Sequence, residues 1–254
     1  IPASTETIDG LAFANCVGLR TLEFEEGSQL KEISSGAFSN CPQMILKNPE
    51  VLTKLRTIGD HAFEDCTSLT AFPLPESLTN IGPAAFRGCF SLSGQIVFPA
   101  SLKNLSAEVF ANCISLESAK FIPREKYVMK PGFFAGCEKL SKVTGLNNAV
   151  EIGACAFMGC TSLRERKLGA GLTSIGDWAF KGCLSLSTDV PASAAKIGED
   201  AFAYTESVTY AGQTEETAPG ALESDSQKIG SHPYFPVSGR TVRKEHQLKL
   251  TAFD

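Results

Sequence analysis

Nine cysteines are the residues of this 254-residue chain most able to do chemistry, because thiols form disulfides, bind zinc and act as nucleophiles. Zinc modules need pairs of cysteines that are separated by two to four intervening residues. Eight of the cysteines instead recur every 23 to 25 residues: Cys16, Cys41, Cys66, Cys89, Cys113, Cys137, Cys160 and Cys183. The spacing argues against zinc and indicates that these eight occupy one position of a repeat.

A disulfide needs two Cα atoms within about 7 Å. If each repeat carries its cysteine on a short helix, equivalent positions on neighbouring helices lie roughly 8–10 Å apart. We therefore expect eight buried free thiols that act as small hydrophobic side chains. A disulfide framework is the alternative, because nine cysteines in a secreted chain would permit one.

The remaining candidate chemistry is sparse. Cys155 lies outside the series, at the repeat position of His61 and Trp178, where helical geometry predicts an outward-facing and inert thiol. His61, His232 and His246 share no short motif with one another or with acidic residues, and the chain has no nucleophile elbow, zinc-protease or phosphate-binding motif. The sequence predicts no enzyme, no metal and no cofactor.

Charge and hydropathy exclude two classes of partner. The formal net charge is −5 and the sequence pI is about 5.4, so the chain offers no broad positive field to nucleic acid or anionic lipid. No apolar run approaches the roughly 20 residues that a membrane helix needs. We expect neither nucleic-acid binding nor membrane insertion by this chain.

A repeat organises the whole chain. Its register is an Ala, Val or Phe followed by Phe, a Cys three residues later and a Leu three beyond that. The key phenylalanines are 22 to 25 residues apart and number nine: Phe13, Phe38, Phe63, Phe86, Phe110, Phe134, Phe157, Phe180 and Phe202. A fixed period of this length is the mark of a solenoid, in which stacked coils share one hydrophobic core.

Each repeat divides into two halves. Ile58, Ala62, Phe63 and Cys66 lie at i, i+4, i+5 and i+8, which predicts a short helix. The segment after the cysteine, 69–75, alternates apolar with small or imino residues and predicts a short strand ended by proline. Strands about 4.8 Å apart on one wall and helices roughly 8–10 Å apart on the other predict a curved solenoid with its parallel sheet on the concave side.

The segment 66–86, CTSLTAFPLPESLTNIGPAAF, resembles the repeat of BspA-type leucine-rich-repeat proteins. The resemblance covers about residues 8–208, with departures at 44–52, at 124–131 and at Arg166, which is polar where an inward apolar residue is expected. It implies an α/β fold, a right-handed leucine-rich-repeat solenoid of nine coils of about 22–25 residues, with short helices on the convex side. It also implies a cell-surface or extracellular adhesion or recognition module without catalysis, whose partner is a protein, such as a host extracellular-matrix protein or another cell-surface protein.

The candidate interaction surface consists of the outward residues of the predicted strands. It has no aromatic ladder for sugar rings or bases and no stripe of one charge, which favours a protein-binding face. A solvated face without a ligand, in a chain that acts only as a structural spacer, is the alternative. The candidates are Thr21, Glu23, Glu25, Ala71, Pro73, Gln95, Val97, Ser118, Lys120, Ile122, Lys142, Thr144, Glu165 and Lys167.

The repeat stops after the ninth coil. We assign residues 1–210 to the solenoid and 211–231, which are rich in small and polar residues, to a flexible linker. Residues 232–254 are predicted to form a strand that caps the open end of the core, because the segment 250–253 repeats the pattern of 69–72. An extension into a further domain is the alternative for this last segment.

Overall fold

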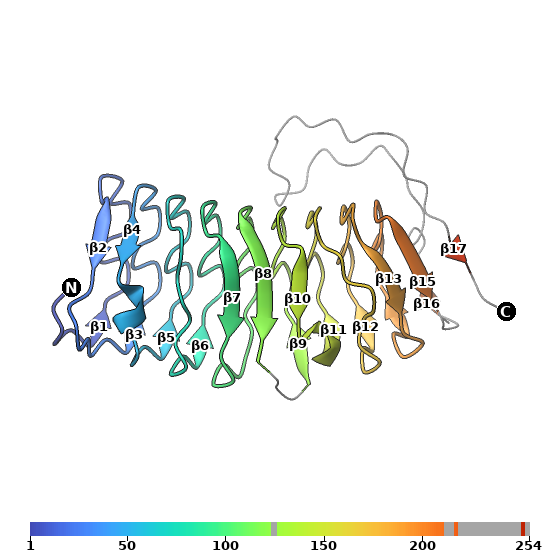
Figure 1. Ribbon diagram of the computed structural model, residues 1–254, viewed down its shortest axis with the longest axis horizontal. Helices are drawn as coiled ribbons and strands as arrows, with labels where there is room; N and C mark the ends of the chain where they lie inside the picture. Colours follow the sequence, from blue (N-terminus) through green and yellow to red (C-terminus); the bar gives the residue numbers. More distant parts are fainter. Residues whose placement is uncertain (123–125, 211–215, 218–249, 252–254) are drawn as a thin grey trace.

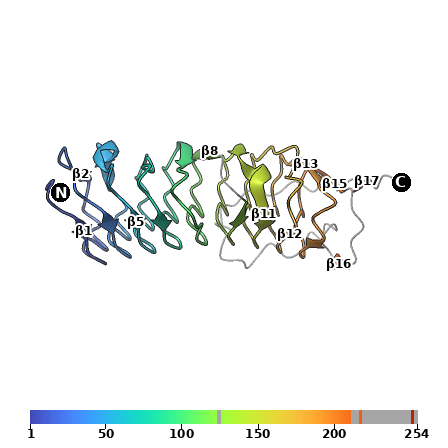
Figure 2. The same ribbon diagram turned by 90° about the horizontal axis from the view of Figure 1, so that it is seen from below.

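The computed structural model describes residues 1–122, 126–210, 216–217 and 250–251. Its coils stack side by side in an extended row (Figures 1 and 2). One key phenylalanine marks each of the nine coils, and every pair of neighbouring strands is parallel. The predicted linker (211–231) and cap (232–254) lie outside the described residues, apart from β16 (Glu216–Thr217) and β17 (Leu250–Thr251), which pair with β14 (Lys196–Ile197) and β15 (Ser207–Tyr210).

One row of very short strands runs along the solenoid just before the key phenylalanines. Each strand buries an aliphatic residue, as Ile58 and Ile175 do. The glycine that often follows is required by close approach: a Cβ at Gly176 would lie 2.5 Å from the backbone nitrogen of Ala154 in the preceding coil. The remaining strands of this row are β1 (Thr7–Ile8), β3 (Glu32–Ile33), β5 (Thr57–Ile58), β6 (Asn80–Ile81), β9 (Tyr127–Met129), β11 (Ala149–Ile152) and β12 (Ser174–Ile175).

A second row, which we call the front row, follows the cysteines. It is divided into three sheets because two coils contribute no strand. Pro73 lies in the first of these coils and cannot donate a ladder hydrogen bond; in the second, around 164–168, only Lys167 forms an isolated bridge, to Asp189. The front-row strands are β2 (Thr21–Glu23), β4 (Ile45–Lys47), β7 (Gly94–Phe98), β8 (Leu116–Phe121), β10 (Lys142–Thr144), β13 (Ser187–Val190), β15 and β17.

The predicted helices are wrong. The described residues contain two 3-10 helices, η1 (Pro49–Val51) and η2 (Leu146–Asn148), and no α-helix. Around each key phenylalanine the chain forms consecutive turns instead, in which every second N–H group donates its hydrogen bond to the next coil. The N–H of Ala62 donates to Gly59 O within its coil at 3.3 Å, whereas that of Phe63 donates to Ala85 O of the next coil at 2.8 Å.

The turns explain a recurrent choice of residue. Two positions in each coil have positive φ, such as His61 at 55° and Asp65 at 56°. This left-handed conformation suits glycine, asparagine and aspartate. The second of the two positions is held mostly by these types: Asn15, Asn40, Asp65, Gly88, Asn112, Gly136, Gly159, Gly182 and Tyr204.

The spacing predicted for this wall is also wrong. The rings of Phe13, Phe38, Phe63, Phe86 and Phe110 stack with successive centroids 5.1–5.4 Å apart, not the roughly 8–10 Å expected of packed helices. Both walls therefore share nearly the same period, about that of paired strands. The unequal spacing from which we inferred a concave sheet is absent, so we call the outward side of the front row the front face.

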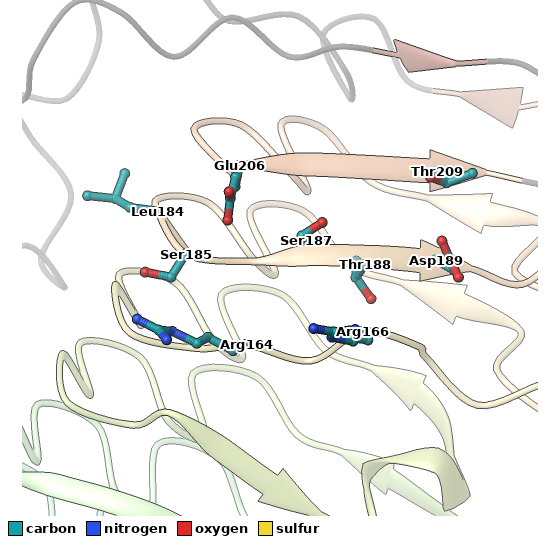
Figure 3. A pocket seen from close by; sticks show the side chains of 9 residues that line it. All are labelled: Arg164, Arg166, Leu184, Ser185, Ser187, Thr188, Asp189, Glu206 and Thr209. Carbon is teal, nitrogen blue, oxygen red and sulfur yellow. The ribbon is translucent and has the colours of Figure 1, made fainter.

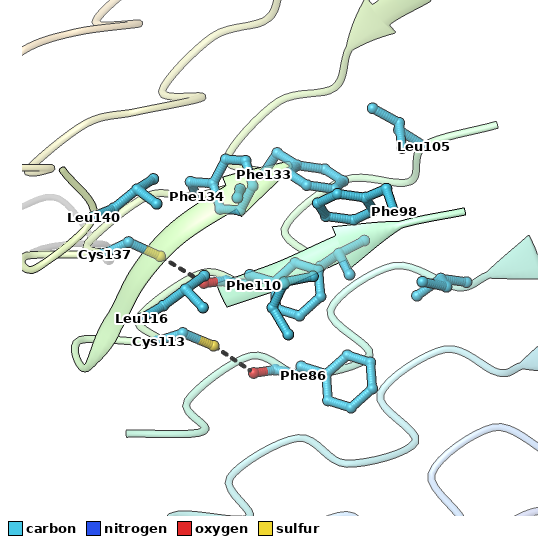
Figure 4. Close-up of a cluster of buried hydrophobic side chains, with 14 of the residues drawn as sticks. Phe86, Phe98, Leu105, Phe110, Cys113, Leu116, Phe133, Phe134, Cys137 and Leu140 are labelled. Carbon is cyan, nitrogen blue, oxygen red and sulfur yellow. Dashed lines mark hydrogen bonds between the residues drawn. The ribbon is translucent and has the colours of Figure 1, made fainter. Parts of the chain in front are cut away.

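The core is continuous along the solenoid. Figure 4 shows its middle, where Phe98, Phe133 and Phe134 pack around Phe110. Every key phenylalanine except Phe13 is fully buried. Each coil therefore depends on its neighbours for burial of its largest side chain, as a solenoid requires.

This dependence predicts a position effect on stability. Phe86→Ala should lower the free energy of unfolding by about 3–5 kcal/mol, because it opens a cavity in a fully buried ring stack. Phe13→Ala should cost less, since Phe13 is only partly buried and stacks on one ring, that of Phe38. Urea unfolding followed by circular dichroism measures both, and equal costs would contradict the nearest-neighbour picture.

Candidate interaction face

The front face is built by simple alternation along the front-row strands. In β2, Thr21 and Glu23 are exposed while Leu22 is buried. Parallel pairing brings equivalent residues of successive coils side by side in two rungs, which are interrupted at the third and seventh coils. Gln95, Ser118 and Lys142 are neighbours in the first rung, and Val97, Lys120 and Thr144 in the second.

The structure places most of the predicted surface residues as expected. The exposed ones are Thr21, Glu23, Glu25, Ala71, Pro73, Gln95, Val97, Lys120, Lys142, Thr144 and Lys167, whereas Ser118, Ile122 and Glu165 are half-buried. Glu25 is exposed but already engaged, because its Oε2 accepts from the N–H of Ala3 at 2.8 Å. Gln95 is engaged as well, because its Nε2 donates to Ser118 Oγ at 3.3 Å. The remaining exposed residues of this set are available to a partner.

The prediction missed several members of the rungs. Ile45 and Lys47 lie beside Thr21 and Glu23, and Ser187 and Asp189 occupy the same rungs in the eighth coil. These residues lie in β4 and β13, which begin one residue closer to the repeat cysteine than β2 and β10 do. A fixed count from the cysteine therefore assigns these exposed side chains to the buried face of the strand. Alternation of apolar and polar residues within each strand would have found them.

We call the wall formed by the turns around the key phenylalanines the turn wall. Most ion pairs among the described residues lie on this wall, and none lies on the front face. Arg87 contacts Glu64 of the preceding coil and, at 3.0 Å, Glu108 of the following one. Lys181 contacts Asp200 at 2.6 Å. The charged residues of the two front rungs, in contrast, form no ion pair with any described residue. Their charges remain available to a partner.

The cysteines form a ladder of buried thiols. From Cys41 to Cys183, each Sγ–H of the series donates to the carbonyl of the key phenylalanine of the preceding coil, as Cys113 does to Phe86 O at 3.2 Å and Cys137 to Phe110 O at 3.1 Å (Figure 4). Burial raises the pKa of Cys66 to about 12. Coils about 5 Å apart do not exclude disulfides by distance, so our geometric reason was wrong. All nine cysteines are nevertheless free.

Two cysteines differ from expectation. Cys16 belongs to the predicted buried series but is exposed, because the first coil has a neighbour on one side only. Cys155 was predicted to face outward, yet it is only 6% exposed. Its position has positive φ in a turn and not a place on a helix surface, and burial raises its pKa to about 11.

These burials predict the order of thiol labelling. A disulfide reagent at pH 8 should react with one thiol of the native chain, Cys16, and Cys16→Ser should remove that reaction. The other eight should react only after unfolding in denaturant, because burial keeps them protonated and inaccessible. Rapid native labelling of Cys155 would contradict the burial described above.

The front face is interrupted at the seventh coil. Arg166 occupies the inward position in this coil, but its side chain is exposed. Glu165 turns partly inward instead, and its Oε1 accepts from the N–H of Val143 at 2.9 Å. Burial raises the pKa of the Glu165 carboxyl, against the opposing effect of this hydrogen bond and of Lys142.

The Glu165 contact predicts a pH-dependent effect on stability. When folding raises the pKa of a carboxyl, the free energy of unfolding falls as pH rises from the unfolded-state pKa toward the folded-state pKa, because the folded chain must then ionise a partly buried group. Glu165→Gln keeps an oxygen for Val143 and should melt at the same or a higher temperature at pH 7, with any gain shrinking toward pH 4. Glu165→Ala should cost about 1–3 kcal/mol, because it leaves the N–H without its acceptor.

Calorimetry at the two pH values separates these effects. A lower melting temperature of Glu165→Gln than of the parent chain at pH 7 would show that the negative charge of Glu165 itself stabilises the fold at the seventh coil.

Two further features bear on function. Within the described ranges, no three His, Cys, Asp or Glu side chains come together as metal ligands do. No helix in the same part of the chain is long and apolar enough to cross a membrane.

Comparisons with known proteins agree with this architecture. The model of the BspA type leucine-rich repeat region matches residues 1–117 and 127–218 in six copies. A leucine-rich-repeat protein of T. pallidum is similar in structure, with a TM-score of 0.54 and 28% identity over 63% of this chain and 72% of that one. No curated protein matches the chain significantly.

Two other solved structures are similar over more of the chain. A leucine-rich cell-surface protein of Faecalibacterium prausnitzii has a TM-score of 0.46 and 21% identity over 86% of this chain and 82% of that one. The pneumococcal vaccine antigen PcpA has a TM-score of 0.49 and 18% identity over 89% of this chain and 71% of that one. The repeat, the parallel solenoid and the match of the family model over most of the sequence show that the chain belongs to the BspA-type leucine-rich-repeat family.

Proposed function

We propose that this chain is a non-catalytic recognition module that binds a protein partner through its front face and acts outside the cell or at its surface. Leucine-rich repeats generally mediate protein–protein interaction and are generally non-enzymatic. Membership in the BspA-type family therefore supports a recognition role. The surface location rests on the resemblance of the repeat to those of cell-surface proteins.

The observation that carries the proposal is the state of the charges on the front face. Glu23, Lys47, Lys120 and Lys142 stand exposed on strands whose backbones are fixed by parallel pairing. None of them is engaged in an ion pair within the described residues, while the turn wall pairs Arg87 and Lys181 with neighbouring acids. Unpaired charges on a rigid frame suit a partner of complementary pattern.

The chemistry of the face favours a protein partner over a glycan or a nucleic acid. Apolar side chains, Ile45, Pro73 and Val97, lie between charged ones in the second to fourth coils. Mixed polar and apolar surface is typical of protein interfaces, and the exposed rungs hold no aromatic ring on which a sugar or base could stack. Binding energy should be spread over several coils, with each polar contact worth about 0.2–1 kcal/mol.

Reversal of front-face charges tests the proposal. The chain is immobilised and purified extracellular-matrix and cell-surface proteins are passed over it by biolayer interferometry. For a partner that binds, the double variant Lys120→Glu, Lys142→Glu should lower the affinity about tenfold or more, which corresponds to about 1.4 kcal/mol. The matched control is Lys130→Glu, Lys196→Glu, which reverses two exposed lysines outside the front row and should leave the affinity unchanged.

The same experiment distinguishes the alternative of a structural spacer. A spacer would bind none of the proteins, and neither double variant would differ from the parent chain. Loss of binding in the control pair with a neutral front-face pair would assign recognition to another face of the solenoid.

A further inference from the structure

The interruption at the seventh coil contains an open polar hollow on the front face. A hollow of about 750 Å³ opens there. Figure 3 shows Arg164 and Arg166 along one side of it, Thr188 and Asp189 on the strand beside them and Glu206 on the next coil. The hollow therefore extends across the seventh, eighth and ninth coils.

The hollow follows from one residue of the sequence. Arg166 is aligned with Thr188, because Lys167 bridges Asp189 and the N–H of Asp189 donates to Arg166 O at 2.9 Å. The eighth coil has Thr188 at this inward position, and the other coils have an apolar side chain there, such as Val143 or Val208. A guanidinium cannot be buried there without a partner, so the Arg166 side chain turns outward and lines the hollow.

Thr188 is left with an unsatisfied hydroxyl beside this hollow. Its side chain is 3% exposed and lines the hollow. The Oγ1 atom is buried and has no hydrogen-bond partner among the described residues. A buried hydroxyl without a partner costs roughly 1–3 kcal/mol, and valine, which the next coil has at the equivalent position as Val208, would avoid that cost. The threonine is explained if a bound group uses the hydroxyl.

The guanidinium groups of Arg164 and Arg166 are available to the ligand that would use the Thr188 hydroxyl. Arg164 and Arg166 are exposed and form no ion pair with a described residue. Both also line a second hollow on the other side of the seventh coil, together with Lys139 and Lys142. Glu165, the acid between the two arginines in sequence, is turned toward Val143. Glu117 and Glu165 also line that second hollow, so its cationic side chains outnumber its acidic ones by four to two.

The surrounding acids limit what can bind. Asp189 and Glu206 line the far side of the hollow and would repel a polyanion or a doubly charged phosphate. A single carboxylate that lies close to the arginines avoids this repulsion, and the planar guanidinium fork matches a carboxylate in a bidentate manner. A threonine hydroxyl supplies a further donor.

We propose that this hollow is a binding site for one aspartate or glutamate side chain of a protein partner, with Arg164, Arg166 and Thr188 as its ligand-binding residues. The proposal rests on the protein-recognition function proposed above and specifies a chemical anchor within it. It makes the seventh coil a point of specificity on a face that is otherwise broad.

A peptide titration tests the site without a known partner. The probe is a blocked hexapeptide of glycine and serine that contains one glutamate, and its twin carries glutamine instead. Binding is followed by NMR through the arginine Nε–H resonances and the threonine methyl resonances of the full chain. We expect two arginine signals, identified by their loss in Arg164→Gln and Arg166→Gln, and the Thr188 methyl to shift with a millimolar dissociation constant, while the glutamine twin leaves them in place.

Two variants separate binding from folding. Thr188→Val should weaken binding of the glutamate peptide about three- to tenfold while leaving the melting temperature of the free chain unchanged or raised, since it removes a hydroxyl that lacks a partner. Arg56→Gln, which changes an exposed arginine far from the hollow, should bind as the parent chain does. A fall in melting temperature with unchanged binding in Thr188→Val would remove the hydroxyl from the site.

Other outcomes overturn the proposal. Equal shifts with the glutamate and glutamine peptides would show that no carboxylate site exists. No shift of the two arginine signals at 20 mM peptide would show the same, because a dissociation constant of roughly 10 mM is the weakest that we would count as binding. Tighter binding of inorganic phosphate or of heparin would reveal a general anion patch, and tighter binding of a uronic acid sugar would assign the site to a glycan. The charge reversals at Lys120 and Lys142 are measured with protein partners and not with these peptides. A negative peptide titration would therefore overturn the carboxylate site without deciding whether the front face binds a protein.

Discussion

Lateral hydrogen bonding between coils is the constraint on which the rest of this structure depends. Alternate N–H groups donate to the next coil through the turn wall, as those of Phe63 and Phe86 do, and the strands do the same on the front. Because a buried backbone donor must be satisfied, each coil is held at nearly the spacing of paired strands around most of its circumference. That spacing stacks the phenylalanine rings and places each repeat thiol within reach of a carbonyl.

The same constraint explains which parts of the fold the sequence could predict. The period, the buried phenylalanines and most of the outward strand residues follow from the positions of apolar side chains, and the structure has them. The helices did not follow, because a stripe of residues at i, i+4 and i+5 suits both a helix turn and the observed run of turns. The distinguishing evidence was the glycine, asparagine and aspartate at one repeat position, which indicates positive φ.

Prediction of the interaction face was limited by small differences in coil length. Where β4 and β13 begin one residue early, a count from the cysteine points to the wrong face, and the predicted set did not include Ile45 or Asp189. Arg166 was recognised as polar at an inward position, but the sequence does not state how the conflict is resolved. The structure resolves it by turning Arg166 outward and Glu165 partly inward, which side-chain pattern alone could not specify.

The two walls therefore differ in how they hold the coils together. The turn wall and its ring stack continue through the seventh coil, with Phe134, Phe157 and Phe180 at centroid distances of 5.7 and 5.2 Å, whereas the front row is broken in the third coil and again in the seventh. A solenoid whose coils remain joined through one wall tolerates loss of pairing on the other. Irregular residues such as Pro73 and Arg166 can thus vary the shape and charge of the front face without separating the coils, and it is on this less constrained wall that a recognition surface can be specified.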